Sequence, residues 1–297
     1  MDENKTLILV RTNGQSSAIR WLEDRNIQNQ FCVRYSYYGD ELSKQNVDHY
    51  YSGGKWSGIF DFFEANKVLN EFEYFWFLDD DIESTPENAL LFQRTAIEHG
   101  FKLAQPALLP DSFFAHSITL ANPQFKFRRT NFVELMMPWM HRSVLTRVLP
   151  LFKDRHAALG LDLFWHQLTD DPTNDVAIVD EAPMGHYRPR RKHLRTNLNK
   201  QAINMFSEKK ETIETFKVKR QLAVVLSAVS KDGTYLIRGP KLWRALLRGF
   251  FHEDNRKHSS GRALYSTAFS LFFQMMARTD ARCFDQAAYE QFIEHSS

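Results

Sequence analysis

Cysteine is scarce in this chain, which carries only Cys32 and Cys283 among its 297 residues. Two cysteines so far apart argue against a disulfide framework and favour a reducing compartment. An excess of either charge is also missing, because 38 Lys and Arg against 36 Asp and Glu leave a formal net charge of +2. That balance argues against a protein that coats nucleic acid, and we expect no nucleic-acid partner.

Long apolar runs are absent as well. No segment approaches the roughly 18 uninterrupted apolar residues that a transmembrane helix needs. The run Leu7–Val10 near the start is too short for the core of a signal peptide. We therefore expect a cytoplasmic protein, either soluble or associated with the cytoplasmic face of a membrane. The length suits one large domain, or one domain with an appendage.

Strand-like and helix-like patterns alternate from the start of the chain to about residue 187. Short apolar or β-branched runs predict strands, and apolar residues at a spacing of three to four predict helices. The predicted strands are "TLILVR", "FCVRYSYY", "YFWFL", "KLAQPALL", "NFVELMMPWMHR" and "DVAIVD"; the predicted helices are "SSAIRWLEDR", "SGIFDFFEANKVLNEF", "SVLTRVLPLF" and "LDLFWHQL". This alternation predicts a Rossmann-like α/β fold, with helices flanking a mostly parallel sheet.

The pattern changes at about residue 196 to mostly helix, with a strand candidate only at "TYLIR". We therefore divide the chain into a ligand-binding domain, residues 1–195, and a mainly helical C-terminal region, residues 196–297. In that region "KLWRALLRGFF" places an apolar face opposite Lys241, Arg244 and Arg248. Such a helix either packs on the domain or lies on a membrane surface, and both readings stay open.

The most informative stretch is "EYFWFLDDDIESTPENA", where an aromatic strand runs directly into Asp79, Asp80 and Asp81. In an open α/β sheet, ligands bind beyond the carboxyl ends of the strands. Three crowded carboxylates need a counter-charge, and a divalent cation that prefers oxygen ligands would supply it, with a diphosphate completing its shell. The alternative is a solvated acidic turn before a helix that starts at residues 85–87.

Two later features carry chemistry of the same kind. Asp162, in "LGLDLFWHQL", is either a helix-capping residue or a general base aimed into a cleft. His186, in "MGHYRPRRKHLR", is either a surface loop residue or a metal ligand beside a phosphate-binding basic cluster that begins at Arg188.

These features, in this order, resemble the GT-A-fold glycosyltransferases. Residues 73–190 are more narrowly similar to a plant and bacterial family, domain of unknown function seven-oh-seven, through "FLDDDIE", "QPALL", "VELMMP", "GLD" and "GHYR". The resemblance implies that residues 1–195 bind a nucleotide sugar, with a UDP-sugar favoured, and transfer the sugar to a hydroxyl of a glycan or a lipid-linked glycan. Surface-polysaccharide synthesis would be one setting, and Mn²⁺ or Mg²⁺ the cofactor.

The resemblance also implies a role for individual residues. Asp162 would be the base, with Glu134 as the rival base or as an acceptor-orienting residue. Since many inverting members carry a Glu-Asp pair where this chain has Leu161-Asp162, retention of configuration stays open. The metal ligands would be Asp79, Asp81 and His186, and the donor-binding residues Arg11, Thr12, Asn13, Lys55, Asp79, Asp80 and Arg188.

Two other functions are compatible with the sequence. One is a sugar- or nucleotide-binding protein without turnover, which has the same fold and lacks the reaction. The other is a D-x-D phosphatase of the haloacid-dehalogenase type, which places its motif on the first strand, whereas here the triplet follows the third predicted strand.

Overall fold

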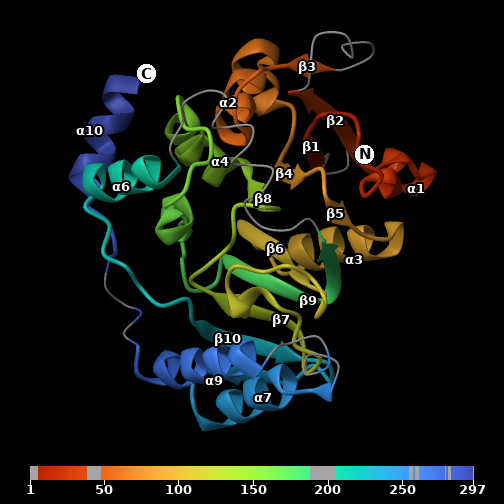
Figure 1. Ribbon diagram of the computed structural model, residues 1–297, viewed down its shortest axis with the longest axis vertical. Coiled ribbons are helices and arrows are strands. Elements are labelled where there is room, and N and C mark those ends of the chain that lie inside the picture. Colours follow the sequence, from red (N-terminus) through yellow and green to blue (C-terminus); the bar gives the residue numbers. More distant parts are fainter. Residues whose placement is uncertain are drawn as a thin grey trace.

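The computed structural model describes residues 6–38, 48–187, 205–253, 257, 261–277, 279 and 282–296. Within them the chain forms a mixed sheet with helices on both faces (Figure 1). The strands are β1 (Thr6–Thr12), β2 (Phe31–Tyr37), β3 (His49–Tyr50), β4 (Tyr74–Asp79), β5 (Ile82–Glu83), β6 (Leu103–Leu108), β7 (Phe125–Thr130), β8 (Trp139–His141), β9 (Val176–His186), β10 (Val225–Ser230) and β11 (Tyr235–Ile237).

The helices complete the α/β alternation that the sequence predicts. The α-helices are α1 (Arg25–Gln30), α2 (Lys55–Asn66), α3 (Pro86–Glu98), α4 (Arg142–Val148), α6 (Met205–Thr215), α7 (Pro240–Phe250), α9 (Gly261–Met276) and α10 (Gln286–Ser296). Short 3-10 helices are η1 (Arg20–Glu23), η3 (Val68–Asn70), η4 (Ser117–Thr119), η5 (Leu149–Phe152), η6 (Leu161–Leu163) and η7 (Trp165–Leu168).

The strand order is β11-β10-β7-β9-β6-β8-β4-β1-β2-β3, with β5 pairing β9 outside this path. The pairs β1–β2, β1–β4, β2–β3 and β6–β9 are parallel. Strand β8 lies between β4 and β6 and is antiparallel to both, so β4 and β6 also run in the same direction. The prediction of a largely parallel sheet flanked by helices is therefore confirmed.

The aromatic run before the acidic triplet is a strand buried on both faces. Tyr74, Trp76 and Leu78 of β4 belong to the core under α3, while Phe75 and Phe77 belong to the core under α2. Side chains alternate along a strand, so a strand between two helical layers must be apolar at every position. The apolar run ends at Asp79, which is the last residue of β4 at its carboxyl end.

The predicted strand over "NFVELMMPWMHR" is wrong except at β8. Residues 131–138 form a loop, and Glu134 lies in that loop rather than in a strand. The loop still accompanies β4, because Pro138 and Met136 accept the amides of Phe77 and Asp79 at 3.0 and 3.1 Å. It leaves strand geometry where the carbonyls of Leu135 and Met136 turn toward the ammonium of Lys55.

Two predicted helices are also shorter than expected. Only η1 forms within "SSAIRWLEDR", and the α-helix α1 begins after it with Asp24 as its N-cap. "LDLFWHQL" forms η6 and η7, separated by Phe164. Both segments have the apolar spacing of a helix, but they make single 3-10 turns rather than continuous helices.

The C-terminal region is not confined to one side of the molecule. Strands β10 and β11 extend the sheet beyond β7, with α7 and α9 beside them, while α6 and α10 lie near α4 at the other end of the view (Figure 1). The sequence predicts the strand at β11 and misses β10. The boundary between residues 195 and 196 falls outside the described residues and stays a prediction.

No helix in the described part of the chain combines the length and the apolar character that crossing a bilayer requires.

Candidate functional site

The acidic triplet lies at the topological switch point of the sheet. The chain builds β1, β2 and β3 outward in one direction and then returns to place β4 on the other side of β1. The register pairs Arg11 at the end of β1 with Asp79 at the end of β4. In open α/β sheets the ligand crevice opens at this place, beyond the carboxyl ends of the two strands.

Each carboxylate of the triplet has a different environment. Asp79 Oδ1 lies 2.7 Å from Lys55 Nζ, and Asp81 Oδ2 lies 3.1 Å from His186 Nε2. Asp80 Oδ2 accepts the backbone amide of Asn13 at 3.4 Å, so the middle carboxylate joins the end of β4 to the loop after β1. The structure thus brings together segments that are more than 100 residues apart in sequence.

His186 reaches the triplet through a small two-stranded pairing. β5 follows the triplet and pairs antiparallel with the end of β9, with Ile82 opposite His186. The other imidazole nitrogen, Nδ1, lies 2.8 Å from the carbonyl of Phe113, where it donates. Burial alone lowers the pKa of His186, but the hydrogen bond to Asp81 and the charge of Asp81 outweigh it and raise the pKa to about 9.

Lys55 is a fixed cation beneath the triplet. Its ammonium donates to Asp79 Oδ1 and to the carbonyls of Leu135 and Met136, at 2.7, 2.9 and 2.8 Å. Three partners use all three N–H donors of a lysine. A donor phosphate would have to displace one of them, and the predicted phosphate contact of Lys55 stays a prediction.

Burial acts in opposite directions on this ion pair. It lowers the pKa of Lys55, and the nearby carboxylates, Asp79 first, oppose that shift. It raises the pKa of Asp79, while Lys55 opposes the rise and the charge of Asp81 adds to it. The carboxylates of Asp79 and Asp81 therefore repel each other, and a bound cation would reduce that repulsion.

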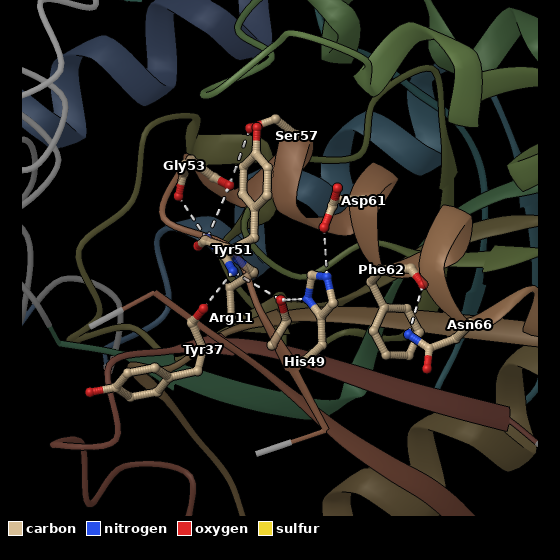
Figure 2. Close-up of polar contacts among 11 residues, drawn as sticks. Arg11, Tyr37, His49, Tyr51, Gly53, Ser57, Asp61, Phe62 and Asn66 are labelled. Atoms are coloured by element: carbon tan, nitrogen blue, oxygen red, sulfur yellow. Dashed lines mark hydrogen bonds and ion pairs between the residues drawn. The ribbon is translucent and has the colours of Figure 1, made fainter. Parts of the chain in front are cut away.

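Arg11, predicted to approach the donor, has its guanidinium donors directed at the protein. Nη1 donates to Ser36 Oγ and to the Tyr37 carbonyl, and Nη2 to the carbonyls of Tyr51, Gly53 and Gly54 (Figure 2). Burial lowers the pKa of Arg11 to about 10. These bonds fix the turn before α2, and a donor contact of Arg11 stays a prediction.

Figure 2 also shows a relay that the sequence did not indicate. His49 lies between Ser36 and Asp61, with Nδ1 2.7 Å from the Ser36 hydroxyl and Nε2 2.9 Å from Asp61 Oδ2. Because Ser36 accepts from Arg11, its hydroxyl is free to donate to His49, which in turn donates to Asp61. The order resembles a nucleophilic triad, but Ser36 is fully buried, so the relay supports Arg11 rather than attacking a substrate.

The glycines of "SGGKWSG" have packing reasons. A Cβ on Gly54 would lie 2.3 Å from the carbonyl oxygen of His156, and a Cβ on Gly58 would lie 2.6 Å from Arg11 Cζ. The amide of Gly54 donates to His156 Nδ1 at 3.1 Å. The turn is thereby held between Arg11 and the loop that leads to Asp162.

The two predicted bases have different surroundings. Asp162 lies inside η6, whose N-cap is Gly160, so the prediction of a helix-capping Asp162 is wrong. Its carboxylate accepts the amide of Gly160 at 3.2 Å, and burial raises the pKa of Asp162 to about 6. Among the described residues, no hydrogen bond or ion pair joins Asp162 to the triplet. Glu134 is buried, and its amide donates to Gln105 Oε1 at 2.5 Å. It directly precedes the two carbonyls that hold Lys55, which places its segment beside Asp79.

Two further predicted donor-binding residues are Thr12 and Arg188, and the structure describes only Thr12. Thr12 is buried at the end of β1, where its hydroxyl accepts the amide of Gly14 at 2.9 Å. Arg188 and the basic run after it lie outside the described residues, so the predicted phosphate contact stays a prediction. The last described residue before it, Tyr187, donates its hydroxyl to Asp111 at 3.1 Å.

The donor set fits a divalent cation that is shared with a ligand. No three His, Cys, Asp or Glu side chains in the described ranges are arranged to hold a metal ion on their own. Asp81 and His186 already face each other, and Asp79 faces Lys55 instead. Magnesium-type ions commonly take only one or two carboxylates from the protein and complete their shell with water and substrate phosphates. The residues present match that arrangement and do not form a closed cage.

Comparison with known proteins gives distant structural likenesses. No family model matches the chain and no curated protein matches its sequence, so the similarity of residues 73–190 to family seven-oh-seven stays a prediction. Similar solved structures include S. aureus TarS 1-349 in complex with UDP-GlcNAc, at 11% identity, TM-score 0.40 and 71% coverage of each chain. S. aureus TarS matches at 10% identity and TM-score 0.43, over 70% of this chain and 43% of that one. The function proposed next depends on the site geometry and not on these likenesses.

Proposed function

We propose that the protein is a metal-dependent glycosyltransferase of the GT-A type. It would move a sugar from a nucleotide-sugar donor, with a UDP-sugar favoured, to a hydroxyl of a glycan or lipid-linked acceptor, as in surface-polysaccharide synthesis. One observation carries the proposal: Asp79, Asp80 and Asp81 leave a doubly buried strand at the switch point and meet Lys55 and His186 there.

The residues at this edge would divide the work of binding the donor. Asp81 and His186 would hold Mn²⁺ or Mg²⁺, and Asp79 would join them or hold a water in the metal shell. When bound, the cation would stabilise the negative charge of the departing nucleoside diphosphate. Lys55 adds a preorganised positive charge beside Asp79, and the backbone amide of Asn13, which donates to Asp80, would bring the loop after β1 to the donor.

The acceptor hydroxyl requires a base. Asp162, with its pKa of about 6, is ionised at neutral pH and basic enough to accept a proton. Glu134 is the second candidate. The next two residues of its loop, Leu135 and Met136, bind Lys55, and Lys55 pairs with Asp79 of the triplet. An inverting reaction needs one of these groups opposite the leaving diphosphate, and loss of turnover with retained UDP binding in Asp162→Asn or Glu134→Gln would identify which.

A binding protein without turnover is the second candidate. It is favoured by the ion pair between Lys55 and Asp79, which neutralises one of the three proposed metal ligands within the protein itself. The D-x-D phosphatase is disfavoured because the triplet ends β4, whereas that class carries its motif on the first strand. Detectable hydrolysis of a sugar nucleotide would separate an enzyme from a binder, and phosphate release from a phosphomonoester would favour the phosphatase.

The first test is calorimetric titration of nucleoside diphosphates, UDP first, with and without Mn²⁺. We expect Mn²⁺-dependent binding by wild type, loss of the Mn²⁺ dependence in Asp81→Asn, and unchanged binding in the control Asp170→Asn, which removes an exposed carboxylate paired with Arg147. If well-folded wild type binds no nucleoside diphosphate under either condition, the donor site is not at the triplet.

A further inference from the structure

Helix α9 turns one of its faces into the molecule. Thr267, Leu271 and Gln274 recur at the spacing of one helical face, and all three are buried. The opposite face exposes large apolar side chains at positions i, i+3, i+4 and i+7. These are Phe269, Phe272, Phe273 and Met276, with exposed fractions of 54%, 59%, 39% and 72%. We call these four residues the outer face of α9.

The orientation of α9 is fixed by contacts at its C-terminal end. Arg238, just after β11, donates through Nη2 to the carbonyls of Gln274 and Ala277 at 2.6 and 2.5 Å. Leu271 joins the core beneath the sheet. Because both anchors lie on the buried side, the aromatic side faces outward. Contiguous exposed apolar side chains of this size mark an interaction surface.

The neighbouring helix α7 supplies positive charge. The apolar face of α7 is buried in the core, so this helix packs on the domain through that face. The face consists of Leu242, Trp243, Leu246 and Phe250. The exposed side of α7 carries Lys241, Arg244 and Arg248. Helices α7 and α9 pack against each other at the same end of the molecule (Figure 1). The sequence left packing and membrane contact open for α7; the structure buries the apolar face of α7, and the exposed apolar side chains lie on α9.

The charge pattern distinguishes between occupants of this face. Neither α7 nor α9 contains Asp or Glu, and Glu253, which follows α7, pairs with Lys257 at 2.9 Å. A second copy of the chain, docked face to face, would oppose like charges. An anionic bilayer offers the complementary charge and an apolar interior, and helices that lie in its surface typically combine aromatic residues with Lys and Arg.

We propose that the outer face of α9, together with the exposed basic side of α7, docks onto an anionic phospholipid bilayer. The aromatic side chains enter the boundary between headgroups and acyl chains, and Lys241, Arg244 and Arg248 contact the headgroup phosphates. Strands β1 and β4 lie toward the other end of the molecule from α7 and α9 (Figure 1), so docking through α9 tethers the protein without covering the acidic triplet. This inference does not depend on the proposed function, and vesicle binding and UDP binding can fail separately.

The experiment is co-sedimentation of the full chain with phosphatidylcholine vesicles, with and without phosphatidylglycerol. We expect binding to the anionic vesicles that weakens as salt rises. Phe272→Glu should reduce the affinity by about tenfold or more, because it removes an inserted ring and adds a repelled charge. Phe206→Glu on α6 is the matched control, since Phe206 is 54% exposed and lies on a helix outside this face.

A charge variant tests the second half of the surface. Arg244→Glu should weaken anionic binding by about tenfold and leave binding to neutral vesicles unchanged, whereas Lys210→Glu on α6 should behave as wild type. If Phe272→Glu does not fold, Phe272→Trp replaces it, and its fluorescence should shift to shorter wavelength on vesicle addition.

Three outcomes would overturn the proposal. Folded wild type fails to bind anionic vesicles, or Phe272→Glu binds as well as wild type. The third is a dimer in size-exclusion chromatography that Phe272→Glu converts to a monomer without any vesicle binding, which would make a second copy the occupant.

Discussion

Two pairs of an aspartate and a cation in this molecule differ in how completely they are closed. Arg128 and Asp180 are both 0% exposed, and Arg128 contacts Asp180 through Nε and Nη2 at 2.8 Å. Arg128 also donates through Nη1 and Nη2 to the carbonyls of Ile118 and Leu120. Lys55 and Asp79 are 13% and 35% exposed and have two further carboxylates beside them. The closed pair balances its own charge, whereas the open pair has negative charge left for a ligand.

The difference in exposure between the two ion pairs separates a structural ion pair from a candidate ligand-binding site. A fully enclosed ion pair is compensated within the protein, and removing one partner leaves an uncompensated buried charge. A pair at the edge of the sheet, with surplus carboxylates, can exchange a partner for a substrate or a metal without unfolding the protein. The aspartate of each pair follows an apolar strand pattern, and only Asp79 is followed by two further aspartates in the sequence.

The largest effect should come from breaking the closed pair. Asp180→Asn leaves Arg128 as an uncompensated buried charge and should lower the free energy of unfolding by about 3–5 kcal/mol. Asp79→Asn, in the open pair, should cost less than about 1 kcal/mol and should abolish the Mn²⁺ dependence of UDP binding. Urea unfolding followed by circular dichroism measures the first quantity. Similar stability losses for both variants would contradict the distinction.

A buried group without any charge partner provides an intermediate case. Burial lowers the pKa of His166 to about 4, and Nδ1 finds no hydrogen-bond partner among the described residues. Since the folded pKa lies below the unfolded value of about 6.5, this stabilising contribution is complete above pH 6.5 and is lost as pH falls toward 4. The loss should amount to about 3 kcal/mol.

His166→Gln removes that titration. The stability difference between wild type and His166→Gln, measured by urea unfolding at several pH values, should therefore narrow as the pH falls from 7 to 4. The exposed residue His295 supplies the control variant His295→Gln, which should stay parallel to wild type across the same range. A stability difference independent of pH would show that His166 is not neutral in the folded protein.

The smallest effect should come from opening the Lys55 pair. Lys55→Gln removes the internal counter-charge of Asp79, so Asp79 becomes available to a cation. We expect Mn²⁺ affinity without nucleotide to rise by roughly fivefold, equivalent to about 1 kcal/mol for a partly exposed ion pair. Calorimetry with Mn²⁺ alone measures it, and Lys67→Gln, which removes an exposed lysine after α2, is the control. Weaker Mn²⁺ binding by Lys55→Gln would mean that Lys55 supports the metal site instead of competing with it.

The sequence predicted the structure well where the apolar pattern of a single strand determines its burial. The β4 run had to be buried on both faces because it is apolar at each position, and its abrupt end at Asp79 predicted carboxylates at the sheet edge. The sequence was a poor guide where a segment depends on a distant partner. Residues 131–138 have strand composition, yet the carbonyls of Leu135 and Met136 turn to bind Lys55, which comes from another element about 80 residues earlier.

The sequence by itself determined the α/β alternation, the acidic end of β4 and the mainly helical character of the C-terminal region, because these follow from local spacing and composition. The resemblance predicted that His186 and Asp81 share one site, and they lie 3.1 Å apart. Only the tertiary structure decided that Arg11 and Lys55 are held by backbone carbonyls and that α9 points its aromatic side outward. Those features depend on strand pairing and on which face of a helix finds a core. Spacing along one element does not encode the identity of its distant neighbours.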